Sequence, residues 1–392
     1  MKTVGSVLEA QNGVGPGFRL LRMVLAISVI YVHGSLLDGA AAAGEWWPYG
    51  ARWALNNFSV PMFFVMSGFL VTASVMRSRV DEFLVNRLVR LVPGLVVVVL
   101  VSAFVLGPLV TTVPLGSYFG DRSFYIYLLN VVGLHRDALP GVFKDNPETL
   151  VNGSLWTLPH EVVCYLLLSL LAMTGALRRR AFVLAATLAL YGIAILLALL
   201  DRSGIRFPLS AAVDYIFLWR GAAHLVPLFL TGVLFYQYRD RIPYNALIAG
   251  GAALGLVALA LAGTVDWQDE PVVWAISAPL FGYLAMFLGL SSWFVLPILV
   301  GIDYSYGIFL YGYPVQQTLT HVMRGSHDYM LFFALSMVPT LILAALSWHF
   351  VEKPALSLRK RLRAASSTAV ERVGALARRA EARPQARIEP GG

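Results

Sequence analysis

The sequence predicts an all-α protein that crosses a membrane about ten times. Of its 392 residues, 58% are hydrophobic and only 13% are charged, whereas a typical soluble domain carries roughly 25% charged residues. The apolar residues form blocks long enough to cross a bilayer as helices, and the mean hydropathy of the chain is +0.70. The alternating ten-residue pattern of an outer-membrane β-barrel is absent. These observations indicate a polytopic membrane protein of the helical type.

Ten apolar segments are expected to span the membrane as helices. They cover residues 18–37, 58–76, 91–111, 155–175, 181–200, 223–238, 245–264, 271–289, 295–318 and 330–351. Three regions follow from this assignment: an N-terminal segment over 1–17, a membrane domain over 18–356 and a basic tail over 357–392. The longest connection, 112–154, contains the aromatic run SFYIYLLNVVGL, which is too short to span a bilayer. We expect a re-entrant or interfacial piece there, with a partial eleventh helix as the alternative.

The basic residues give the expected orientation of the spans. With the N-terminus in the cytoplasm, 22 of the 30 Lys and Arg residues fall in cytoplasmic loops, the N-terminal segment and the tail. The positive-inside rule therefore predicts that both termini are cytoplasmic, and that the tail lies on anionic lipid. This distribution explains the net charge of +8 without a nucleic-acid partner. The single cysteine, Cys164, excludes an internal disulfide and a cysteine-rich metal site, and no metal is expected.

The first predicted span contains two side chains that a bilayer disfavours, Arg22 and His33. They are eleven residues apart, so both lie on one stripe of the helix, separated by roughly 16 Å along its axis. His33 is the one side chain in this helix that titrates near neutral pH, which makes it a candidate general base. A hydrogen-bonded interior histidine is the alternative. Arg22 would equally suit a snorkelling anchor at the cytoplasmic end.

A second group of cations lies in the segment DEFLVNRLVRLVPGL, which is expected to be a cytoplasmic loop. Arg87 and Arg90 are three residues apart and therefore share a helical face, while Pro93 is expected to mark the start of the third span. Two adjacent guanidiniums at a membrane surface suit a phosphate group, and Arg22 is expected at the same face. The alternative is that the two arginines only orient the protein in the membrane, as the positive-inside rule describes, and bind no ligand.

The second and fourth predicted spans add further candidates. Ser67 and Gly68 lie mid-span, where a glycine lets another backbone or a thin substrate arm approach closely; plain helix packing is the alternative. Glu161 lies inside the fourth span, at about the depth expected for His33. A carboxylate beside an imidazole would orient it, while protonation or structural pairing of Glu161 is the alternative. His160 points about 100° away from Glu161 and ranks below His33.

Hydroxyl groups collect around the ninth predicted span, in GIDYSYGIFLYGYPVQQ. The five side chains are Tyr304, Ser305, Tyr306, Tyr311 and Tyr313. They suit a polar acceptor, although tyrosines near an interface are also common membrane anchors. In the last segment, SWHFVEKPAL, Glu352 is expected to have a structural role and to close off the basic cluster.

Together these segments resemble the membrane acyltransferase-3 family, the inner-membrane O-acyltransferases that modify bacterial glycans and some secondary metabolites. The resemblance spans about residues 18 to 357 and rests on the first helix and on FFVMSGFL, NRLVRLVP, LWTLPHEVVCY, SYGIFLYGYP and VEKP, in this order. The chain departs from the family at Tyr311 and Gly312, where many relatives carry a Trp-His pair, and LWTLPHE replaces the more usual Trp-Ser-Leu-x-x-Glu. It resembles the stand-alone form, without an esterase-like domain.

The resemblance implies an enzyme that uses acyl-CoA, most often acetyl-CoA, as a co-substrate and that holds no tightly bound cofactor. It also implies that the phosphates of the donor bind at the cytoplasmic end, on Arg22, Arg87 and Arg90. The thin pantetheine arm would pass Ser67 and Gly68 and place the thioester near His33.

In this interpretation His33 deprotonates a sugar hydroxyl that arrives from the outer side, and Glu161 orients the imidazole; a covalent acyl-histidine is the less favoured variant. Trp156 and Tyr306 are expected to contact the substrate. The acceptor would belong to an exopolysaccharide, a lipopolysaccharide or a secreted glycolipid, and the location would be the bacterial inner membrane. The sequence leaves the oligomeric state open, with a homodimer as one alternative.

Two other functions are compatible with these residues. A proton-coupled transporter or flippase for a glycan or lipid-linked precursor would use His33 and Glu161 as a proton relay. The internal repeat that is common in transporters does not stand out. A structural partner in a complex that assembles envelope polysaccharide would tolerate the replacement of His33. In every case the lipid bilayer is a partner, and the acyltransferase interpretation adds acyl-CoA and a glycan or glycolipid acceptor.

Overall fold

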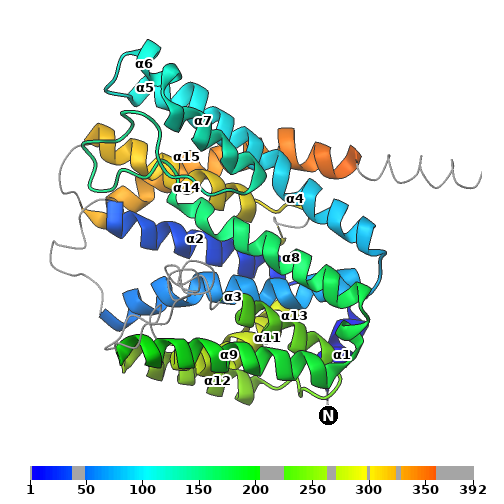
Figure 1. Ribbon diagram of the computed structural model, residues 1–392. Coiled ribbons are helices and arrows are strands. Elements are labelled where there is room, and N and C mark those ends of the chain that lie inside the picture. The colour runs from blue at the N-terminus through cyan, green and yellow to red at the C-terminus, as the bar shows by residue number, and fades with distance from the viewer. Residues whose placement is uncertain are drawn as a thin grey trace, which may run out of the picture.

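The computed structural model describes residues 2–37, 49–203, 225–262, 271–297, 301–323 and 328–358. In these ranges the chain forms a bundle of helices (Figure 1), and the one β-type contact is an isolated bridge between Thr3 and Pro243. The predicted fold class, an all-α polytopic membrane protein, is confirmed. The predicted basic tail lies outside the described residues from position 359 onward.

Each of the ten predicted spans overlaps one of ten helices. These are α2 (Phe18–Leu37), α3 (Tyr49–Val75), α4 (Val80–Val101), α8 (Leu158–Met173), α9 (Arg180–Arg202), α11 (Leu225–Gln237), α12 (Ala246–Leu261), α13 (Pro271–Leu290), α14 (Ser305–Met323) and α15 (Tyr329–Ser347). In the described part of the chain, seven helical segments are long and apolar enough to cross a membrane, and α11 and α12 are shorter apolar helices. Apolar blocks form helices in a bilayer because a helix satisfies its own backbone hydrogen bonds.

The third of these helices begins earlier than predicted. α4 starts at Val80 rather than at residue 91, and Pro93 lies inside it rather than at its start. Two acidic residues occupy its first turn, where carboxylates stabilise a helix N-terminus. The predicted start was wrong because hydropathy marks the apolar part of a helix, and this helix continues into polar sequence. Arg87 and Arg90 therefore lie on a rigid helix and not in a loop.

The ninth predicted span was placed about ten residues too early, because α14 begins at Ser305 and not at residue 295. Gly301 has a φ of +81°, a left-handed conformation that interrupts a right-handed helix. Asp303 then caps α14. Its Oδ1 accepts hydrogen bonds from the Ser305 N–H at 3.3 Å and from the Ser305 hydroxyl at 2.5 Å. The cap fixes the direction of the Asp303 carboxylate.

The connection 112–154, which the structure describes in full, holds only short helices. They are α6 (Leu115–Gly120), α7 (Arg122–Leu128), the 3₁₀ turn η3 (Leu129–Val132) and the start of the 3₁₀ turn η4 (Gly153–Thr157). The Tyr118 hydroxyl donates to the carbonyl of Ala103 at 2.7 Å, within the π turn η2 (Ser102–Leu106) that follows α4. The predicted aromatic run forms α7 and η3, which are too short to span a bilayer and pack on the end of α4.

A close helix contact joins α3 and α11. A side chain at Gly68 would begin 2.0 Å from the carbonyl oxygen of Phe229, and one at Gly232 would begin 1.9 Å from that of Val65. The two glycines let the backbones touch, as small residues do in membrane bundles. The space beside Gly68 is therefore filled by α11. This supports the packing interpretation of Gly68 and corrects the expectation that a substrate arm passes there.

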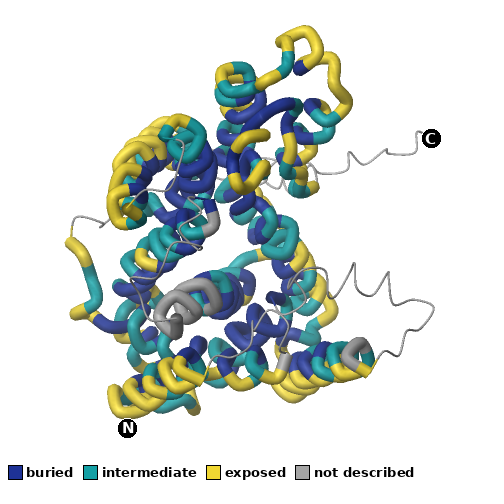
Figure 2. The backbone as a smooth tube through the Cα atoms, turned by 90° about the vertical axis from the view of Figure 1, so that its left-hand side faces the viewer, coloured by how far each residue is buried: buried dark blue, intermediate teal, exposed yellow. Residues whose placement is uncertain are grey.

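Large apolar side chains cover the outer faces of the bundle. Figure 2 shows exposed residues along the outward faces of the helices and buried residues toward the interior. On α12 the exposed Leu247, Leu254 and Leu261 are spaced by seven residues and form one stripe. An apolar surface of this kind would associate in water, so these faces suit contact with lipid.

One end of the bundle collects arginines. The helices alternate in direction, so α2 begins where α3 ends and α4 begins. The short helix α1 (Val4–Ala10) is tied to the same end, where the Gly5 N–H donates to the carbonyl of Arg239 at 2.9 Å. We call this the basic end; its arginines include Arg19, Arg22, Arg77, Arg79, Arg87, Arg90, Arg239 and Arg241.

Candidate active site

A pocket lies near the basic end, among α2, α3, α4, α8 and α14. Its volume is about 160 Å³ and most of its wall is apolar. The charged side chains that line it are Arg22, Arg87, Arg90 and Glu161. Hydroxyl groups come from Ser67, Thr157, Tyr165, Ser305 and Tyr306. Most of the predicted site residues therefore meet in one place. The described residues contain no cluster of three or more His, Cys, Asp or Glu side chains that could hold a metal ion.

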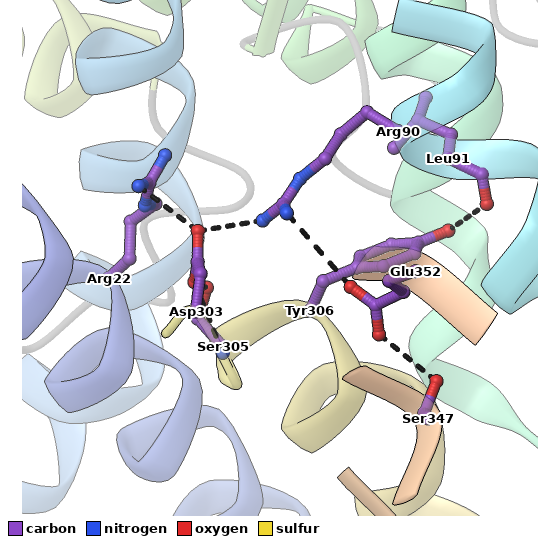
Figure 3. Close-up of polar contacts among 8 residues, drawn as sticks. All are labelled: Arg22, Arg90, Leu91, Asp303, Ser305, Tyr306, Ser347 and Glu352. Carbon is purple, nitrogen blue, oxygen red and sulfur yellow. Dashed lines mark hydrogen bonds and ion pairs between the residues drawn. The ribbon is translucent and has the colours of Figure 1, made fainter. Parts of the chain in front are cut away.

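Asp303 joins two of these arginines (Figure 3). Its Oδ2 lies 2.8 Å from Arg90 Nη2 and 3.1 Å from Arg22 Nη2, so one oxygen atom bridges α4 and α2. Burial raises the pKa of the Asp303 carboxyl, but the guanidiniums of Arg22 and Arg90 outweigh burial and hold the pKa well below its ordinary value. Asp303 is therefore an anion at neutral pH. The sequence prediction missed Asp303, although the Asp-x-Ser spacing of a helix cap was a usable signal.

Arg90 faces a second carboxylate on its other side. Glu352 Oε2 lies 3.9 Å from Arg90 Nη1, and Glu352 Oε1 accepts a 3.0 Å hydrogen bond from the Ser347 hydroxyl. The π turn η10 (Trp348–Glu352) at the end of α15 brings Glu352 to this position. The rings of Tyr306 and Trp348 lie 5.9 Å from the Arg90 guanidinium. Arg90 is thus enclosed, in agreement with the structural role expected for Glu352.

Arg87 has a different environment. Among the described residues it has no carboxylate within ion-pair distance, and its buried Nε has no hydrogen-bond partner. Its guanidinium carbon lies 5.8 Å from the ring centre of Phe83 and 6.0 Å from that of Tyr165. Neighbouring rings hold a guanidinium without using its N–H groups. Arg87 therefore offers hydrogen-bond donors to a ligand in the pocket.

Two further polar side chains belong to the wall near the arginines. Glu161 accepts a hydrogen bond from the Tyr165 hydroxyl, one turn along α8, and lies within electrostatic range of Arg87 and Arg90. The Tyr306 hydroxyl donates to the carbonyl of Leu91 at 2.7 Å and ties α14 to α4. Both side chains are therefore engaged within the protein.

His33 lies farther along α2, away from the basic end. Its Nδ1 is 3.5 Å from the Ser154 hydroxyl, and its ring meets the Tyr313 ring edge-on, with 5.1 Å between centres. Ser154 belongs to the 3₁₀ turn η4 (Gly153–Thr157). Asn152 holds this turn, because its Oδ1 accepts from the Ser154 N–H at 3.2 Å and its Nδ2 donates to a carbonyl of α14 at 2.9 Å. A hydroxyl beside Nδ1 leaves Nε2 to exchange a proton with a substrate.

The inner end of the pocket approaches His33. Thr157 and Phe309 line the pocket. They lie about one helical turn from Ser154 and Tyr313, the two side chains that contact His33. The pocket therefore extends from the arginines toward the imidazole along the bundle.

Comparison with known proteins decides the family. The acyltransferase-3 model, described as an acyltransferase domain, matches residues 16–349. The chain belongs to this family. It is 26% identical over 342 residues to the "O-acetyl transferase" of Shigella phage Sf6. This alignment covers 86% of this chain and 94% of the phage protein. It is 30% identical over 390 residues to "Nodulation protein 10" of Rhizobium leguminosarum bv. viciae, covering 92% and 98% of the two chains. No solved structure matches the chain.

These comparisons confirm the predicted enzyme class, an O-acetyltransferase of the acyltransferase-3 family. Together with the apolar helices, they also confirm a multi-pass membrane protein. Nearly all of the matched range coincides with the predicted membrane domain, since it begins at residue 16 and ends at residue 349.

In this acyltransferase the expected pairing of Glu161 with His33 is not formed. Ser154, seven residues before Glu161, is the side chain that contacts His33, and about 10 Å of helix separates the two positions. The expected common depth was wrong because α8 is preceded by the turn η4, which places Ser154 beside His33 and carries Glu161 on toward the arginines.

The two predicted substrate contacts of the acyltransferase lie in different surroundings. Trp156 is half-buried, on η4 between Ser154 and Thr157, and its carbonyl accepts a 3.0 Å hydrogen bond from His160 Nδ1. It lies beside the pocket rather than on its wall. Tyr306 lies on the wall at the arginine end, where its hydroxyl is bonded to α4.

Proposed function

We propose that this acyltransferase moves an acetyl group from cytoplasmic acetyl-CoA to a sugar hydroxyl of an exopolysaccharide, a lipopolysaccharide or a secreted glycolipid. The observation that carries the proposal is a pocket that is lined by three arginines and approaches His33 at its inner end. It combines an anion-binding end with a nearby side chain that can move a proton. The name of the phage relative, an O-acetyl transferase, supports acetyl as the transferred group.

The donor binds through its phosphates at the basic end. Guanidiniums form strong, directional hydrogen bonds with phosphate oxygens, and Arg87 has a buried donor without a protein partner. Ser67 and the apolar wall suit the pantetheine arm. The pocket lies near the basic end of the bundle, so the adenosine end of the donor stays at the membrane surface. Arg22 and His33 are separated by roughly 16 Å along α2, of the order of an extended pantetheine arm.

His33 acts as the general base. Its Nε2 takes the proton of the acceptor hydroxyl while the hydroxyl oxygen attacks the carbonyl carbon of the thioester. The tetrahedral intermediate then breaks its carbon–sulfur bond. CoA leaves as the thiolate and takes the proton from the imidazolium, so the products are the sugar ester and free CoA, and His33 is neutral again. Ser154 orients the ring through Nδ1, and no acyl-histidine is required.

The acceptor arrives from the end opposite to the basic end. The positive-inside rule assigns the basic end to the cytoplasm, and with it both termini. In a bacterial inner membrane the acceptor glycan is then on the outer side, where the connection 112–154 and Trp156 are closer to His33 than to the arginines. Glu161 lies on the wall of the donor site with Arg87 and does not orient His33.

Mass spectrometry of envelope glycans and secreted glycolipids tests this function. Cells that produce the wild-type chain should carry sugars heavier by one acetyl group, and cells that lack the chain or produce His33→Ala should carry the same glycans without it. An identical acetylation pattern in all three would contradict the proposal. If deletion instead stops the glycan from reaching the cell surface, the function is that of a transporter or flippase.

A further inference from the structure

The three arginines of the pocket have different partners in the structure, although the sequence predicts the same role for all three, the binding of donor phosphates. Arg22 and Arg90 share Oδ2 of Asp303, at 3.1 and 2.8 Å, whereas Arg87 has no carboxylate at ion-pair distance among the described residues. We propose that Asp303 is a positioning residue for donor binding, which holds Arg22 and Arg90 in place while Arg87 makes the direct contact with a donor phosphate. This proposal rests on the proposed function of the pocket as the donor site.

The start of α14 fixes the position of Asp303. Its Oδ1 is held by the N–H and the hydroxyl of Ser305, and its Oδ2 points to the two arginines (Figure 3). The side chain is only 11% exposed. A carboxylate held at both oxygens does not swing away when another anion arrives. Asp303 is therefore a fixed part of the pocket and not a competitor of the donor.

Asp303 also makes the arginine pair possible. Two guanidiniums that reach the same oxygen atom repel each other, and this repulsion is strong in a low-dielectric interior. The carboxylate between them offsets the repulsion, and the carboxyl group of Glu352 lies on the far side of Arg90, at 3.9 Å. Without Asp303 the protein would bury two unbalanced like charges, which would move apart or toward solvent. The arrangement of their N–H groups around the pocket would then be lost.

Arg87 is the arginine best placed to bind the phosphate directly. Its Nε, like that of Arg22, is buried without a hydrogen-bond partner, and a buried donor that lacks a partner is unfavourable. Arg22 also pairs with Asp303, whereas Arg87 has no carboxylate at ion-pair distance among the described residues. Phe83 and Tyr165 hold the guanidinium through their rings and leave its N–H groups to a ligand. A phosphate oxygen would satisfy this donor and balance the charge.

Double-mutant cycles on the full-length protein test this division of roles. KM and kcat with acetyl-CoA and the unfolding temperature in detergent are measured for each variant. Asp303→Asn should raise KM about tenfold, the effect of weakening one charged hydrogen bond, and leave kcat at saturating donor nearly unchanged. It should also lower the unfolding temperature, because Arg22 and Arg90 lose their counter-ion.

The cycle of Asp303→Asn with Arg90→Gln should show coupling. The unfolding temperature of the double variant should fall by less than the sum of the two single effects. Each single variant leaves one member of the Asp303–Arg90 pair buried without the other, whereas the double variant removes both. The matched cycle replaces Arg90→Gln by Arg87→Gln. It should be additive in unfolding temperature, and its KM effects should multiply, because Asp303 does not contact Arg87.

Ser305→Ala keeps the test decisive if Asp303→Asn fails to insert into the membrane. This variant retains every charge and removes only a hydroxyl that anchors the carboxylate. It should raise KM severalfold and leave kcat unchanged, an effect that a merely structural role for Ser305 would not produce.

Three results would overturn the proposal. The first is an unchanged KM in Asp303→Asn, and the second is a lowered KM, which would mean that the carboxylate competes with the donor. The third is equal coupling of unfolding temperatures in the two cycles. A wild-type protein that shows no saturable use of acetyl-CoA would instead refute the proposed function. In that case the unfolding-temperature cycles still decide whether Asp303 holds Arg90.

Discussion

Replacing His33 by alanine is expected to abolish acyl transfer and to leave the fold intact. A positioned general base contributes about 10² to 10⁴ to a rate, so kcat should fall by a factor of that order. The side chain is half-buried and its contact with the Ser154 hydroxyl is long, at 3.5 Å, so the unfolding temperature should change little. The measurement is the initial rate at saturating acetyl-CoA in membranes with equal amounts of each protein.

His349→Ala is the matched control for this prediction. His349 is exposed near the end of α15, where its Nε2 lies 3.2 Å from the Tyr304 hydroxyl, and the proposed mechanism gives it no role. This variant should keep the wild-type kcat. A His33→Ala enzyme that retains more than about a tenth of the wild-type kcat would show that His33 is not the general base.

Replacing Arg87 by glutamine is expected to raise the KM for acetyl-CoA by about 10- to 100-fold, which corresponds to the loss of a charge-assisted hydrogen bond. Chemistry at His33 should be little affected, because Arg87 lines the pocket whereas His33 lies beyond its inner end, against Ser154. The kcat at saturating donor should therefore stay within a fewfold of the wild type. Steady-state kinetics over a range of acetyl-CoA concentrations separates the two parameters.

Arg79→Gln is the control for a general effect of positive charge at the same face. Arg79 is 80% exposed at the basic end and pairs with Asp81 at 3.1 Å, so it attracts anions to the surface without lining the pocket. Its replacement should leave KM nearly unchanged. Equal increases of KM in the two variants would mean that Arg87 acts only through the charge of this face, as a topology signal does.

The fold could be predicted because apolar blocks of bilayer length have one stable solution, the helix. The helix starts were harder. The polar beginning of α4 and the loop before Ser305 differ from the predicted edges by about ten residues. Hydropathy reports what contacts lipid, and it does not report where backbone hydrogen bonding begins or where a glycine with positive φ ends it.

The site could be predicted in its composition but not in its pairing. Arg22, Arg87, Arg90 and Glu161 do line one pocket, because costly polar groups in a membrane protein gather where they can balance one another. Their partners depend on turns that carry little periodic signal. The turn before α8 gives His33 the hydroxyl of Ser154 rather than the carboxylate of Glu161. Likewise the cap of α14 supplies Asp303, which lay inside a segment predicted to be part of a spanning helix.

Membrane vesicles of known sidedness test most directly the claim that the donor enters at the basic, cytoplasmic end while the acceptor arrives at the other. Acetyl-CoA carries several negative charges and does not cross a sealed bilayer unaided. When labelled acetyl-CoA is added outside, inside-out vesicles should transfer label to their glycan or glycolipid, and vesicles with His33→Ala should not. Sealed right-side-out vesicles should gain label only after permeabilisation. Equal labelling of sealed right-side-out vesicles would contradict the account.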